Sequence, residues 1–147
     1  MKLSFSTRGW GDLSWDTLLD TALEMKFTGI EVYDLYKFPA LTGKGGPFHP
    51  HRVAATIRQL RDKKLSIPCL DTSLDLSACQ ENADILNTML SCARELRVPY
   101  VVCWASRGDE VSEAVLYDRI AALLPRSEEL GVGILLKTSG IFADTGR

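Results

Sequence analysis

Five short apolar runs recur along this chain, and they constrain its fold more than any other feature. Each run is rich in β-branched or aromatic residues, and a segment of helical period separates it from the next. Successive runs begin roughly 30 residues apart, a spacing that suits crossovers between parallel strands. Both faces of the runs are apolar, as in strands buried within a parallel sheet. The sequence therefore predicts an α/β fold with parallel strands over 3–6, 29–33, 66–70, 100–104 and 133–136.

The four intervening segments have the apolar period of amphipathic helices. The first is predicted to begin at Ser14, whose hydroxyl can cap the free amides of the first turn, and the second at Pro50. The fourth should kink or restart at Pro125, because proline cannot donate to the carbonyl one turn earlier. The residues predicted to be buried are Leu18, Leu19, Ala22 and Leu23; Val53, Ile57 and Leu60; Ile85, Leu86, Met89, Leu90, Ala93 and Leu96; and Leu116, Ile120, Leu123 and Leu124.

A weak internal repeat marks the passage from each helix to the following strand. Lys26, Lys64, Arg97 and Gly131 hold the same place in it. The residue after a helix often adopts the left-handed conformation, which is nearly free of strain only for glycine. We expect the two lysines and the arginine to adopt it nevertheless, at about 1 kcal/mol of strain each.

The composition is that of one soluble globular domain. The chain has 147 residues, of which 46% are hydrophobic and 24% charged, with a formal net charge of −2. This charge leaves no basic face for phosphate contacts, so we expect no nucleic-acid partner. No apolar stretch approaches the roughly 20 residues of a membrane span, and no signal peptide or C-x-x-C pair is present. These features predict a cytoplasmic protein with reduced thiols and no membrane partner.

The segment from 130 to 147 carries a more specific pattern: a helix end, an apolar strand and the start of a loop. It resembles the fifth strand of the sugar phosphate isomerase/epimerase family, the xylose-isomerase-like barrels. In that family a Gly-Val-x-Leu-x-x-Glu-Thr-x-Gly pattern delivers a metal-binding glutamate, and here Lys137 holds that place. The segments 29–31 and 98–102 resemble the family as well.

The resemblance implies a partial TIM barrel of about four and a half (β/α) units out of eight. Residues 1–147 would then form a single barrel domain, truncated after the fifth strand. Three interpretations of its function remain open. The chain is an isomerase/epimerase-like protein that is inactive by itself, a non-catalytic module that binds sugars or proteins, or a fragment of a full-length isomerase.

Candidate site residues follow from the barrel rule that working side chains stand at the C-terminal ends of strands. Together with the resemblance, this rule indicates Lys137 and Glu31 as candidate catalytic residues. A sugar or sugar phosphate is the small-molecule partner that the resemblance implies. The candidate substrate-binding residues are Tyr33, Asp71, Ser73 and Trp104.

The resemblance also implies chemistry with a divalent metal such as Mn, Mg or Co. Two glutamates, an aspartate and a histidine at the ends of strands five to eight would hold the metal, and a proton would move through an enediolate. Only the first of these positions falls within the sequence, at Lys137, and an ammonium has no lone pair for a metal. We therefore expect no metal cofactor for this chain. Lys137 itself has three interpretations: a remnant that extends to water, a cation for a phosphate or enediolate oxygen, or an imine-forming lysine.

A half-barrel leaves the inner faces and edges of its first and fifth strands uncovered. Apolar surface of this kind is stabilised by burial against a partner. We accordingly expect a homodimer through the exposed half-barrel surface, or else a chain that aggregates.

Overall fold

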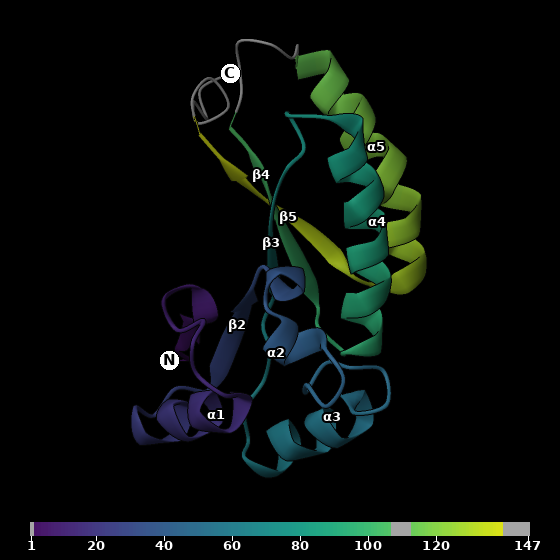
Figure 1. Cartoon of the computed structure of the whole chain (residues 1–147). Helices are drawn as coiled ribbons and strands as arrows, with labels where there is room; N and C mark the ends of the chain where they lie inside the picture. Colours follow the sequence, from purple (N-terminus) through teal and green to yellow (C-terminus); the bar gives the residue numbers. More distant parts are fainter. Residues whose placement is uncertain (1, 107–112, 140–147) are drawn as a thin grey trace. The chain divides into compact units, whose positions relative to one another are not determined.

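Strands and helices alternate along the chain, which is described by a computed structural model over residues 2–106 and 113–139 (Figure 1). Five parallel strands form one sheet in the order β1-β2-β3-β4-β5, which confirms the predicted α/β class with parallel strands. The strands are β1 (Ser4–Ser6), β2 (Gly29–Tyr33), β3 (Leu70–Asp75), β4 (Tyr100–Ala105) and β5 (Gly133–Thr138).

Four longer helices and three short helical turns connect the strands. The four longer helices are α1 (Trp15–Glu24), α3 (Val53–Asp62), α4 (Gln80–Glu95) and α5 (Glu113–Leu130), and the short turns are η1 (Thr7–Gly9), η2 (Leu35–Lys37) and α2 (Pro39–Thr42). Among these helices, none combines the length and the apolar composition that crossing a membrane requires, within the described residues.

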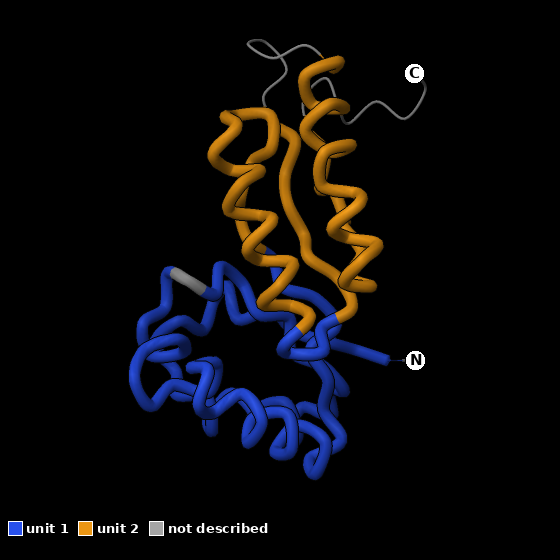
Figure 2. Tube along the Cα trace, turned by 90° about the vertical axis from the view of Figure 1, so that its right-hand side faces the viewer, with its two compact units in different colours: residues 1–71, 95–98 blue, residues 72–94, 99–147 orange. Residues whose placement is uncertain are grey.

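The chain divides into two compact units (Figure 2). The first comprises Met1–Asp71 and Glu95–Val98, and it contains β1, β2, α1 and α3. The second comprises Thr72–Arg94 and Pro99–Arg147, and it contains β4, β5, α4 and α5. The boundary falls within β3, whose first two residues belong to the first unit.

In the first unit, α1 begins where the sequence predicts. The Ser14 hydroxyl accepts a hydrogen bond from the Thr17 amide at 3.2 Å, which satisfies one of the free amides of the first turn. The prediction that Leu23 is buried is wrong, because its side chain is 41% exposed on the edge of the apolar stripe. Helix α3 begins at Val53 rather than at Pro50, which lies in the preceding turn.

In the second unit, α5 runs without interruption through Pro125, so of the two predicted outcomes, a kink or a restart, the restart does not occur. Leu123 and Ser127, on either side of the proline, are both buried. Packing of this face outweighs the single backbone hydrogen bond that a proline removes. Two predicted core residues are instead exposed, Ile85 at 40% and Leu124 at 46%.

The third strand lies later in the sequence than predicted. Two residues of the expected segment pair with β2: Ser66 forms an isolated bridge to Gly29, and Leu70 begins the regular ladder by pairing with Val32. Between these two pairings β2 advances three residues, from Gly29 to Val32, whereas its partner advances four, from Ser66 to Leu70. The partner segment therefore accommodates one extra residue in a bulge. Pro68 lies inside this segment and has no amide hydrogen to donate to a ladder, which explains the delay.

The four helix-to-strand turns adopt the left-handed conformation that the repeat predicts. The φ angles are 58° at Lys26, 56° at Lys64, 58° at Arg97 and 63° at Gly131. At Lys26 the next amide, of Phe27, donates to the carbonyl of Ala22 at 2.8 Å, closing the helix end. This bond is the signature of a Schellman cap, which a lysine can form despite its Cβ.

Candidate functional site

Trp104 and Lys137 lie side by side near the C-terminal ends of β4 and β5. The two residues are register partners in the parallel ladder, which aims their side chains to the same face of the sheet. The Lys137 Nζ lies 5.4 Å from the centroid of the Trp104 ring, within the range of a cation–π interaction. Both side chains are half-buried. The structure therefore brings together two residues that the sequence indicates as site candidates.

Asp75, at the C-terminal end of β3, is the centre of a hydrogen-bond cluster that sequence reasoning missed. Its Oδ1 accepts from the Ser77 amide at 2.9 Å, the Ser77 hydroxyl at 2.5 Å and the Ser106 amide at 3.4 Å. The Ser106 hydroxyl donates to Oδ2. Burial by itself raises the pKa of the Asp75 carboxyl, but the hydrogen bonds from Ser106 and Ser77 together outweigh it and hold the pKa below its ordinary value.

The same cluster ties the loop after β3 to its neighbours in the second unit. The Asn82 amide group donates to the Asp75 carbonyl at 2.7 Å, and the Leu76 amide donates to the Trp104 carbonyl at 2.8 Å. From α5, Arg119 donates to the Leu76 carbonyl at 2.6 Å. Asp75 and Trp104 are thus parts of one bonded network at the ends of β3 and β4.

The misplaced third strand explains why Asp75 was missed. With the strand predicted to end at residue 70, Asp71 and Ser73 are expected in the loop after it, and this placement is wrong. Both residues lie inside β3, where Asp71 is only 1% exposed and Ser73 has a left-handed φ of 53°. The signal that could have corrected the placement is Pro68, followed by the Asp75-Leu76-Ser77 turn pattern.

The first unit carries its own polar group at the ends of β1 and β2. The Glu31 Oε2 lies 3.5 Å from the Cys69 Sγ and accepts its hydrogen bond. The Arg8 Cζ lies 5.2 Å from the centroid of the Tyr33 ring. The backbone amide of Tyr33 donates to the hydroxyl of the buried Thr7 at 2.9 Å. Glu31 and Tyr33 therefore stand where the sequence predicts them, and their roles remain predictions.

Just beyond β2, an ion pair joins Asp34 and Lys37. Asp34 has a left-handed φ of 48°, and its amide donates to the Asp71 carbonyl at 2.5 Å. The hydrogen bond to Asp34 raises the pKa of the Lys37 ammonium. Because the Lys37 side chain is 71% exposed, the pair shapes the loop and contributes little to stability.

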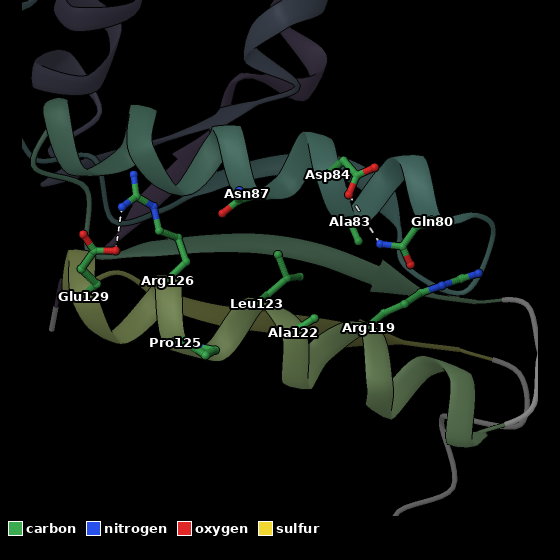
Figure 3. A pocket seen from close by; sticks show the side chains of 10 residues that line it. All are labelled: Gln80, Ala83, Asp84, Asn87, Arg119, Ala122, Leu123, Pro125, Arg126 and Glu129. Carbon is green, nitrogen blue, oxygen red and sulfur yellow. Dashed lines mark hydrogen bonds and ion pairs between the residues drawn. The ribbon is translucent and has the colours of Figure 1, made fainter.

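A groove of about 390 Å³ runs between α4 and α5 in the second unit (Figure 3). Arg126 and Leu123 point from α5 toward α4, and Arg126 donates to Glu129 at 2.7 Å and to Ser91 of α4 at 3.2 Å. Gln80 and Asp84 bond to each other on α4 at 3.5 Å. Arg126 pairs with Glu129, Arg119 donates to the Leu76 carbonyl and Asp84 accepts from Gln80, so each of these charged side chains has a protein partner. The groove therefore identifies the side of α5 that packs on α4 rather than a ligand site.

The donors in the described ranges do not make a metal site. No three His, Cys, Asp or Glu side chains among residues 2–106 and 113–139 lie close enough together to hold an ion. Lys137 directs its ammonium over an indole ring. A cation cannot donate electron pairs to another cation, so the residues present do not fit a divalent metal.

Comparison with known proteins agrees with this architecture. No family model matches the chain, and no curated protein matches it. Among solved structures, the probable 3-DHS dehydratase AsbF from Bacillus anthracis superposes with a TM-score of 0.74 at 18% identity, over 92% of this chain and 52% of its own. The fold is that of about half a xylose isomerase-like barrel.

Other solved barrels give the same result. The zinc-binding IolI protein has a TM-score of 0.74 at 18% identity, over 94% of this chain and 51% of its own. A xylose isomerase domain protein from Salmonella typhimurium LT2 has a TM-score of 0.74 at 13% identity, over 90% of this chain and 47% of its own. The half-barrel thus spans about half the length of the structures that it matches.

The half-barrel is expected to bind Mn²⁺ no more tightly than about 1 mM, since hard divalent ions need six or more oxygen ligands. Lys137→Glu alone should not create a site, because one carboxylate supplies too few of those oxygens. Isothermal titration with MnCl₂ measures both proteins, and Lys44→Glu, in an exposed loop, is the control for added charge. A micromolar Mn²⁺ site in either the parent or Lys137→Glu would contradict this expectation.

Proposed function

We propose that the half-barrel recognises a sugar or sugar phosphate at the ends of β4 and β5, through Trp104 and Lys137. The observation that carries the proposal is the ammonium of Lys137, 5.4 Å from the indole centroid, at the strand ends where (β/α) barrels place their working residues. The names of the matched structures support the substrate class, since they include a D-tagatose 3-epimerase-like protein and xylose isomerase domain proteins.

The chemistry of the pair suits such a ligand. A half-buried indole offers an apolar surface on which the carbon face of a sugar ring can stack. The adjacent ammonium can pair with a phosphate, or with an oxygen that becomes negative when an enediolate forms. Asp75 and Ser106 brace the same strand ends, which keeps the Trp104 backbone in place. The pair is thus suited to bind a polyhydroxylated anion.

Catalysis is a further step in this proposal. Proton transfer between neighbouring carbons of a ketose requires a group that accepts and returns a proton, and the Glu31 carboxylate of the first unit stays a candidate for that role. We expect no epimerase turnover from residues 1–147 alone, because the described residues hold no metal site and span about half of a barrel. The complete activity would then require further (β/α) units.

Lys137→Met tests the binding proposal, because methionine keeps the length of the side chain and removes its charge. We expect D-fructose 6-phosphate to bind the parent with a measurable Kd, and Lys137→Met to weaken it roughly 10- to 30-fold, as expected for loss of one charged partner. D-fructose should be much less affected by Lys137→Met. Trp104→Leu should weaken both ligands. Isothermal titration or chemical-shift perturbation gives the six dissociation constants.

Lys44→Met is the matched control, since it removes one positive charge from an exposed loop. It should leave both dissociation constants unchanged. The proposal would be overturned if neither ligand saturates the parent below about 10 mM, which is weaker than specific recognition requires. It would also be overturned if Lys137→Met and Lys44→Met weakened binding equally.

A further inference from the structure

The last strand of the sheet has an uncovered edge. All six residues of β5 pair with β4, and β5 has no other strand partner in the described part of the chain. Leu135 and Leu136 are 44% and 37% exposed, although they occupy consecutive positions that point to opposite faces. A β-strand with a free edge and apolar residues exposed on both faces is a template for pairing with another strand.

Helix α5 exposes apolar side chains on the side away from α4. Arg119, Ala122 and Arg126 line the groove against α4. With 100° between successive residues, Tyr117, Ile120 and Leu124 lie on the opposite flank of the helix. Tyr117 is 64% exposed, Leu124 is 46% exposed and Ile120 is half-buried. We call these three residues the open stripe.

In a complete (β/α) barrel the next unit covers a surface in this position. The comparison structures are about twice as long as this chain. In a TIM barrel the strands follow in sequence order, so a sixth strand would pair with the β5 edge and its helix would pack on α5. The free edge of β5 and the open stripe of α5 therefore form one interaction surface.

We propose that a second copy of this chain covers this surface, through its own β5 edge and open stripe. Such an interface is isologous, the commonest kind in homodimers. The two β5 strands would pair antiparallel and the two α5 helices would cross near Ile120. Tyr117 of one copy would then face the partner's Leu124, so that apolar residues meet apolar residues on both sides of the two-fold axis.

The other end of the sheet is a poorer complement. On α1, Asp16 accepts from Gln59 at 2.9 Å and Asp20 accepts from Lys63 at 3.0 Å, which identifies the flank that faces α3. The opposite flank carries Thr17, Thr21 and Glu24, which are polar. Packing them on the open stripe would bury polar groups against Tyr117 and Leu124, so the open stripe is matched best by itself.

Sedimentation equilibrium at protein concentrations of about 1 to 100 µM, where ordinary homodimers associate, tests the proposal. We expect the parent chain to be a dimer in this range. Leu124→Glu should weaken it on the order of 100-fold, because the two-fold interface then buries two carboxylates, each against the partner's tyrosine. Ile85→Glu is the matched control, since Ile85 is 40% exposed on α4, and it should leave the dimer unchanged.

Introducing opposite charges at the two facing positions tests the two-fold geometry. It also distinguishes a variant that no longer dimerises from one that no longer folds. Tyr117→Lys alone should also weaken the dimer. The double variant with Tyr117→Lys and Leu124→Glu should restore most of it, because each lysine faces the partner's glutamate. A parent chain that is folded by circular dichroism and monomeric throughout this range would overturn the proposal and assign the surface to further (β/α) units. Dimerisation that is insensitive to Leu124→Glu, or a double variant no better than the single ones, would overturn it equally.

Discussion

Asp75→Ala should lower the free energy of unfolding of the half-barrel by about 3 kcal/mol, among the larger effects of a single substitution. The carboxylate accepts hydrogen bonds from the amides and hydroxyls of both Ser77 and Ser106. Its removal leaves these donors to find partners elsewhere, and it releases the ends of β3 and β4 from each other. Urea denaturation followed by circular dichroism measures the change.

Asp84→Ala is the matched control, because this exposed carboxylate of the same unit accepts a single long hydrogen bond in the described structure, from Gln80 at 3.5 Å. We expect it to change the free energy of unfolding by less than about 0.5 kcal/mol. Equal effects of the two substitutions would show that the Asp75 cluster does not stabilise the loop.

The same carboxylate should give the protein an acid-sensitive contribution to stability. Hydrogen bonds hold the pKa of Asp75 in the folded protein below the ordinary value of 3.8. Its contribution is therefore present above the unfolded pKa and is lost as the pH falls through the folded pKa. Asp75→Asn, which does not titrate, should be less stable than the parent at neutral pH, and the difference should shrink below about pH 4. If the difference in unfolding free energy between the parent and Asp75→Asn stayed constant from about pH 7 to about pH 3, the carboxylate would make no acid-sensitive contribution and the prediction would be wrong.

Leu86→Ala should cost about 3 kcal/mol of unfolding free energy, because it empties a fully buried position. Leu86 is 0% exposed, whereas its neighbour Ile85 is 40% exposed. Ile85→Ala removes a side chain of the same size from the same helix, and it should cost less than about 1 kcal/mol, since alanine also has the higher helix propensity.

Thermal or urea unfolding of the two variants gives the comparison directly. Similar losses of unfolding free energy from Leu86→Ala and Ile85→Ala would mean that both side chains are buried, and that α4 packs on the sheet through a different face. Because Ile85 is also the control surface for the dimer experiment, a small effect there strengthens both tests.

Much of the fold could be predicted because it depends on local chemistry. The strand at 29–33 has the observed bounds, and the strands near 100 and 133 begin where predicted. The Ser14 cap needs only a hydroxyl and the amide three residues later. The left-handed turns at Lys26, Lys64 and Arg97 follow from the closure of a helix end. Each of these features involves residues within a few positions of one another.

The tertiary structure alone decided the features that depend on partners far along the chain. The ladder of β3 begins at Leu70 because β2 offers its partner there and Pro68 cannot join a ladder earlier. Periodicity placed both Ile85 and Leu86 on a buried face, and only packing separated the covered side of the helix from its edge. Asp75 meets Ser106 across 31 positions because β3 and β4 end side by side. A sequence read alone shows which residues can bury or bond, while the pairing of distant strands determines which of them actually do.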